Sequence, residues 1–138
     1  MIRIRTYKNE DLLRIEAQPA QKVETGLFNP IKEAEAECYT IFDDANDFII
    51  CILVFTPVSE ERCIIGALLS AQSGKYFVGL RKIIHNFLNI YNFTRLECMV
   101  RASFPQGHRL VKLLGFSLEG TLRKFCKGED YCIYARVK

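Results

Sequence analysis

Apolar and polar side chains alternate along the first half of this chain with the period of β-strands. Residues 2–7 alternate apolar and basic side chains, as in a strand with one buried face. Residues 38–42 and 48–55 are apolar runs separated by a turn rich in Asp and Asn, which predicts a hairpin. After a second turn at 57–61, residues 63–71 form a third apolar run. The pattern therefore predicts an N-terminal strand followed by a three-strand meander.

The clearest helix is predicted over residues 74–91. Apolar residues recur there at spacings of three, four and seven, which places them on one helical face. This face comprises Phe77, Leu80, Ile84, Phe87, Leu88 and Tyr91.

Shorter elements lie on either side of the meander and the long helix. Upstream of the meander the sequence predicts short helices, with Asn9 as an N-cap candidate, over residues 9–17, 20–25 and 30–36. Downstream of the long helix it predicts a strand, a short helix capped by Gly115 and two final strands, over residues 94–102, 105–114, 116–126 and 131–137. Helices that link strands in this order indicate an α/β fold, a mixed central sheet flanked by helices, in a single domain spanning residues 1–138.

Composition limits the class of protein and its compartment. The chain has 138 residues, of which 49% are hydrophobic and 25% charged, as is typical of one globular domain. It contains no apolar run long enough to cross a bilayer and no signal-peptide core, so we expect an intracellular, non-secreted protein without a membrane span. The six cysteines form no Cys-x-x-Cys pair, and we expect reduced thiols and no metal site.

The net charge of +3 conceals an asymmetry between the two halves. Residues 1–61 contain 6 Lys and Arg against 12 Asp and Glu, whereas residues 62–138 contain 13 against 4. A basic half is suited to a phosphate-bearing ligand or nucleic acid. An unevenly charged, solvated surface explains the same numbers. We favour that second interpretation, and do not expect nucleic acid as a partner.

Several C-terminal motifs resemble the GCN5-related N-acetyltransferase (GNAT) family. Residues 93–100 are similar to the strand that follows the family's long helix. Residues 113–120, Leu-Leu-Gly-Phe-Ser-Leu-Glu-Gly, are similar to its Leu-Gly-Phe…Glu-Gly signature, and residues 130–134 to its final strand. The resemblance implies the GNAT fold, and an acetyl-CoA cofactor where a member is active.

A narrower resemblance is to GNAT-like proteins of tailed phages, including the internal virion proteins of podoviruses. It is carried by residues 67–70, 107–109, 128–130 and 134–137, with Gln18 and Gln21 similar to a paired-glutamine segment of that group. It implies a location in the host cytoplasm or the virion. Other phage virion proteins or a host protein would be the partners.

The family binds the cofactor's pyrophosphate with an Arg/Gln-x-x-Gly-x-Gly/Ala loop at the start of the long helix. Here the equivalent residues 70–76 contain one glycine and one lysine, and the full motif is absent. A plain helix start, with Ser73 as cap and Lys75 in solvent, accounts for the same residues and is somewhat favoured. The cofactor-binding candidates that the resemblance implies are Leu69, Ser70, Ser73, Gly74 and Lys75.

The catalytic groups of the family are not all present. Its proton-donating tyrosine corresponds to Val111, and an asparagine commonly found seven residues earlier corresponds to Phe104. Candidate bases are His108, at a helix start, and Glu97, in a strand where a surface charge ladder is the favoured interpretation. Glu119 belongs to the fold signature, and we expect a structural role for it.

Three hypotheses follow from these residues. The first is a phage-encoded GNAT-fold protein with a degenerate acetyl-CoA site and a role in the virion or its assembly. The second is an active acyl-CoA-dependent N-acetyltransferase that uses Ser73, Gly74 and Lys75 for phosphate and His108 or water for proton transfer. The third is a phage effector that binds a host protein or nucleic acid.

Overall fold

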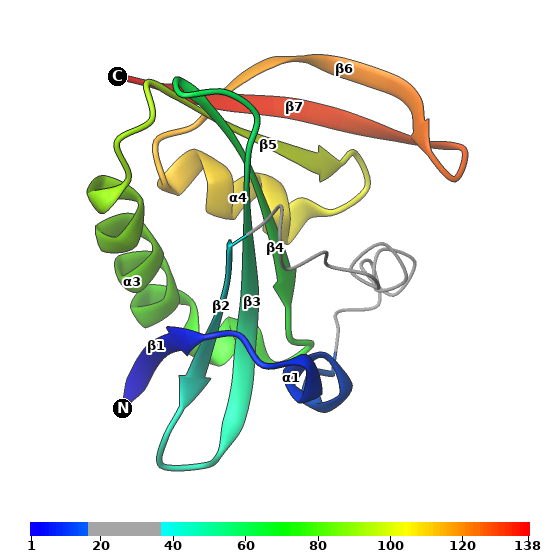
Figure 1. Cartoon of the computed structure of the whole chain (residues 1–138). Coiled ribbons are helices and arrows are strands. Elements are labelled where there is room, and N and C mark those ends of the chain that lie inside the picture. The colour runs from blue at the N-terminus through cyan, green and yellow to red at the C-terminus, as the bar shows by residue number, and fades with distance from the viewer. Residues whose placement is uncertain (17–36) are drawn as a thin grey trace.

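The computed structural model describes residues 1–16 and 37–138, which contain one seven-stranded sheet in the order β1-β2-β3-β4-β5-β7-β6 (Figure 1). All neighbouring strands are antiparallel except β4 and β5, which are parallel. The predicted mixed sheet flanked by helices is confirmed. In chain order, the elements are β1 Ile2–Thr6, α1 Asn9–Arg14, β2 Glu37–Asp43, β3 Phe48–Pro57, β4 Arg62–Leu69, the 3-10 helix η2 Ser73–Tyr76, α3 Phe77–Ile90, β5 Arg95–Arg101, α4 Pro105–Leu113, β6 Ser117–Cys126 and β7 Glu129–Val137.

Helix α1 begins one residue earlier than its sequence suggests. The N-cap is Lys8, so Asn9 is the first helical residue and the predicted asparagine cap is wrong. The start of the helix is stabilised instead by Asp11, whose carboxylate accepts a hydrogen bond from the Lys8 N–H at 2.9 Å. The helices predicted over 20–25 and 30–36, together with Gln18 and Gln21, lie outside the described residues.

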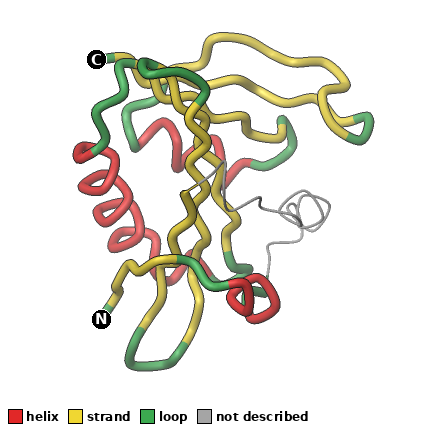
Figure 2. The backbone as a smooth tube through the Cα atoms, in the orientation of Figure 1, coloured by secondary structure: helices red, strands yellow, loops and turns green. Residues whose placement is uncertain are grey.

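The two faces of the sheet are covered by different helices (Figure 2). Leu53 and Phe55 of β3 belong to the main core, which also contains the buried face of α3 and two residues of α4, Leu110 and Val111. Ile52 and Leu68 point to the opposite face and pack with Ile15, just after α1. Among the described residues, no helix is both long and apolar enough to span a membrane.

The sheet opens between its two parallel strands. Strands β4 and β5 pair only at Arg62↔Arg95, Cys63↔Leu96 and Ile64↔Glu97. Beyond these pairs β4 stays with β3 as far as Leu69, while β5 stays with β7 as far as Arg101. The carboxyl-terminal halves of the two strands therefore diverge, and their side chains face an opening in the middle of the sheet.

Candidate functional site

A cavity of about 210 Å³ occupies the opening between β4 and β5. Helix α4 and the β6–β7 hairpin complete its walls. Arg101 is the one ionised side chain among the described residues that line it. The lining residues are Gly66, Ala67, Leu69, Cys98, Met99, Val100, Arg101, Phe104, Gly107, Leu110, Val111, Phe125, Cys126 and Tyr131.

Close packing of α4 on β5 forms one wall of this cavity. Phe104 is the N-cap residue of α4 and is 3% exposed, and Val111 is 7% exposed. A Cβ atom added at Gly107 would lie 2.7 Å from the Phe104 ring and 2.8 Å from Val100, so only glycine fits there. The two positions where the family resemblance implies an asparagine and a tyrosine thus contribute hydrocarbon to the cavity wall.

His108 follows Gly107 but is not among the residues that line the cavity. Its Nε2 lies 3.0 Å from the Ala102 carbonyl oxygen and its Nδ1 lies 2.8 Å from the Tyr134 hydroxyl. Because a carbonyl can only accept, Nε2 donates to Ala102, and in the neutral imidazole Nδ1 accepts from the Tyr134 hydroxyl. Both ring nitrogens are therefore engaged inside the protein, and use of His108 as a base would require breaking the Tyr134 bond.

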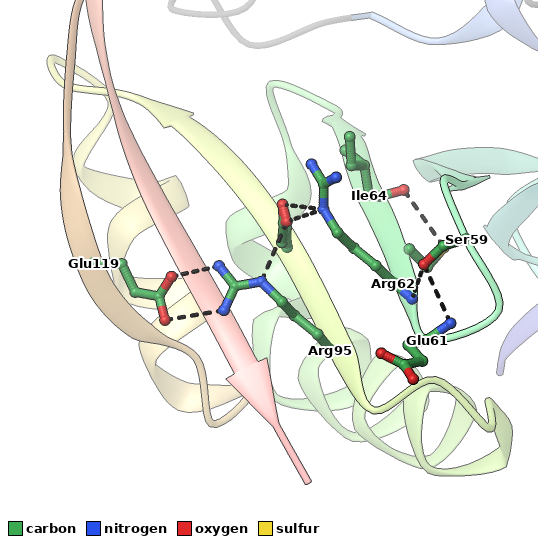
Figure 3. Close-up of polar contacts among 8 residues, drawn as sticks. Ser59, Glu61, Arg62, Ile64, Arg95 and Glu119 are labelled. Atoms are coloured by element: carbon green, nitrogen blue, oxygen red, sulfur yellow. Dashed lines mark hydrogen bonds and ion pairs between the residues drawn. The ribbon is translucent and has the colours of Figure 1, made fainter.

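Glu97 is buried, with 3% of its surface exposed, so the predicted surface charge ladder is wrong. Arg62 approaches its carboxylate to 2.6 Å and Arg95 to 3.3 Å (Figure 3). Hydrogen bonding from Arg62, with a smaller contribution from Arg95, outweighs burial and lowers the pKa of Glu97. Arg95 also binds Glu119, so the four side chains form one ion-pair network across three strands. This network lies where β4 and β5 still pair, at the closed end of the opening.

The cofactor-binding candidates cluster at the end of β4. Leu69 lines the cavity, and Ser70 and Ser73 are buried. Ser73 is not a helix cap, because Gln72 takes that position and no side chain caps η2. An added Cβ at Gly74 would meet no atom within 4 Å, so the approach to this glycine is open.

Three backbone N–H groups of this turn already donate within the chain. The N–H of Gln72 donates to the Ser70 hydroxyl at 3.1 Å, that of Ser73 to the Ser70 carbonyl at 3.0 Å, and that of Lys75 to the Gln72 carbonyl at 3.4 Å. The Lys75 ammonium lies 3.4 Å from the Gln72 side-chain oxygen. An anion cradle requires amides that point at the ligand, and here those amides are occupied. The amides of Gln72, Ser73 and Lys75 would therefore have to give up these hydrogen bonds before they could bind a pyrophosphate.

Sequence reasoning did not identify Arg101, Phe125 or Tyr131 as site residues. Alternation along residues 94–102 could have shown that Arg101 shares a face with Glu97. Phe125 and Tyr131 reach the cavity because β7 of the β6–β7 hairpin pairs with β5, a contact between segments distant in the sequence. The six cysteines are free thiols, although only Cys51 and Cys63 are buried. No group of three or more metal-ligating side chains occurs among the residues that the structure describes.

Solved structures with the same architecture are GNAT-family and other N-acetyltransferases. An N-acetyltransferase from Staphylococcus aureus superposes with a TM-score of 0.73 at 17% identity, over 99% of this chain and 97% of that one. A GNAT-family acetyltransferase from Bacillus anthracis gives 0.71 at 14% identity, over 99% and 94%. The chain has the GNAT fold.

A variant of the spermidine N-acetyltransferase of Vibrio cholerae shares the GNAT fold with this chain as well. Its TM-score is 0.70 at 16% identity, over 99% of this chain and 93% of that one. No protein-family model matches the sequence, and no curated protein matches it. At these identities the likeness extends to the fold and not to the chemistry of the site.

Proposed function

We propose that this chain is a GNAT-fold protein of a tailed phage, with a degenerate acetyl-CoA site and a role in the virion or its assembly. The observation that carries the proposal is the apolar wall formed by Phe104 and Val111. The resemblance implies a tyrosine at the position of Val111 as the group that protonates the leaving thiolate, and a valine side chain cannot take that role.

Two further features support loss of acetyl transfer. His108 is held between Tyr134 and the Ala102 carbonyl, outside the lining of the cavity. Gln72, Ser73 and Lys75 use their N–H groups within the turn that would hold pyrophosphate. The small number of polar side chains that line the cavity agrees with this proposal.

Calorimetric titration with acetyl-CoA tests the degenerate site. A ligand present at one hundred times its Kd stabilises a folded protein by about 2.7 kcal/mol, so thermal unfolding provides an independent readout. We expect no heat of binding at micromolar acetyl-CoA and no rise in Tm. Micromolar affinity accompanied by a rise in Tm would contradict the proposal.

The role in the virion rests on the resemblance of residues 63–138 to phage proteins. Other virion proteins, or a host protein met during infection, would be its partners. Mass spectrometry of purified particles tests this part separately, and we expect the chain among the packaged proteins. Its absence from particles, with presence in infected cells, would contradict the virion role.

An active acyl-CoA-dependent N-acetyltransferase is the second candidate. The observation in its favour is the cavity between two parallel strands, in a fold shared with N-acetyltransferases. If acetyl-CoA binds, Lys75→Ala should weaken the affinity more than the matched change Lys112→Ala on the outer surface of α4. Equal effects would show that phosphate is not held at residues 73–75.

A further inference from the structure

Among the described residues that line it, the cavity between β4 and β5 combines a hydrocarbon surface with one cation, Arg101. Apart from thiols and the Tyr131 hydroxyl, the other described side chains that line it are apolar. We propose that the cavity binds a small apolar carboxylate, whose anionic group pairs with Arg101 while its hydrocarbon part contacts Phe125 and Tyr131. The inference rests on the proposed function only in that both treat this cleft as a ligand site.

Arg101 lies at the end of β5, and its side chain is 18% exposed. A guanidinium so far removed from water requires an anionic partner, and its planar fork suits a carboxylate. Glu129, at the start of β7, provides that partner through one contact of 3.2 Å.

The Arg101–Glu129 pair is the kind that a ligand can displace. The Glu129 side chain is 44% exposed. In the buried network, by comparison, the Glu97 side chain is 4% exposed and its carboxylate lies 2.6 Å from Arg62. The pair is part-buried, with Arg101 on the buried side and Glu129 on the exposed side, so water can solvate the Glu129 carboxylate when a ligand carboxylate takes its place on Arg101. A ligand carboxylate that arrives with buried hydrocarbon would therefore replace Glu129 at low cost.

The hydrocarbon part of the ligand would lie against two aromatic rings of the cavity wall. The rings of Phe125 and Tyr131 lie 5.4 Å apart and both line the cavity. Tyr131 is 5% exposed and is the cross-strand partner of Arg101, while Phe125 is 50% exposed and marks the surface end. Apolar cavities of about 150 Å³ hold benzene, so about 210 Å³ accommodates one ring with a short chain.

Titration of the full chain with 3-phenylpropionate and with its neutral isostere 3-phenylpropionamide tests the proposal. We expect the carboxylate to bind about tenfold more tightly, as for a charge-assisted hydrogen bond. Arg101→Gln should abolish that preference while leaving the affinity for the amide unchanged. Lys112→Gln removes the same charge away from the cavity and should leave the preference intact.

Glu129→Gln provides a test that does not depend on Arg101→Gln folding. Because it removes the competing anion, it should raise the affinity for 3-phenylpropionate several-fold and leave the amide unaffected. Equal binding of the two probes, failure of the carboxylate to bind, or an unchanged affinity in Glu129→Gln would overturn the proposal. Tight acetyl-CoA binding with the carboxylate preference intact would contradict only the proposed function.

Discussion

Asp11 shows how one buried carboxylate positions a helix on a sheet. Its side chain is fully buried and accepts hydrogen bonds from Arg5 and Thr40, each at 2.7 Å, and from the Lys8 N–H. These donors come from β1, β2 and the residue that caps α1. One side chain therefore holds three segments together near the N-terminus.

Asp11→Asn should destabilise the fold by about 2–4 kcal/mol, because it leaves the Arg5 guanidinium without its anion. Denaturation in urea measures this loss. Asp47→Asn is the matched control, since Asp47 forms an exposed ion pair with Arg14 and its own side chain is 90% exposed. The control should change stability by less than about 0.5 kcal/mol. Equal losses in the two variants would contradict the role given to Asp11.

Two carboxyl groups should make stability fall at acidic pH. Burial opposes ionisation of Asp11, but hydrogen bonds from Arg5, Lys8 and Thr40 lower its pKa to about 2. Hydrogen bonds from Asn46, Tyr76 and the Ala45 N–H lower the pKa of Asp43 to about 2 as well.

Unfolded aspartates titrate near about 3.9, so the unfolded chain takes up these protons first. The stabilisation is therefore complete above about pH 4 and is lost as pH falls towards 2. Unfolding free energies measured from pH 5 to pH 2.5 should show this decline, with a shallower slope in Asp11→Asn. An unchanged slope in that variant would contradict the assignment.

At the scale of elements, the contact between α4 and β5 determines the shape of the cavity. Gly107→Ala would place a Cβ atom within 2.8 Å of Phe104 and Val100, so α4 must move. We expect a loss of about 1–3 kcal/mol, measured by chemical denaturation. Gly74→Ala is the control, because no atom lies within 4 Å of its added Cβ, and it should cost less than about 0.5 kcal/mol. A larger loss in the control would contradict the packing described.

Local periodicity predicted most elements because it reports directly which side chains are buried. The long amphipathic helix, the β2–β3 hairpin and the α4 helix closed by Gly115, whose φ is 90°, all follow from such patterns. The burial of Glu97 could not be predicted, since its partner Arg62 lies 35 residues earlier in the chain. The set of side chains that line the cavity was equally hidden, because it depends on where β4 and β5 diverge, and each strand alone has an ordinary pattern.

At the scale of the whole molecule, the uneven charge of the sequence appears as two helices, α3 and α4, that carry basic but no acidic side chains. The acidic residues Glu97, Glu119 and Glu129 are each held by an arginine of the sheet. Helices α3 and α4 pack on one core and contain no acidic residue. Their basic side chains are Arg81, Lys82, Arg109 and Lys112, with the Arg109 guanidinium 4.8 Å from the centre of the Phe77 ring at the start of α3.

Release of free CoA thiol tests most directly whether this fold has lost acetyl transfer. The protein would be incubated with acetyl-CoA and a panel of amines comprising spermidine, free amino acids and a peptide with an N-terminal alanine. Thiol appearance would be followed by absorbance after reaction with a disulfide reagent, corrected for the six cysteines of the chain. The account predicts a rate equal to that of buffer with every amine, because Val111 cannot replace the tyrosine that the family resemblance implies as proton donor to the leaving thiolate. Saturable, amine-dependent release of CoA would contradict it.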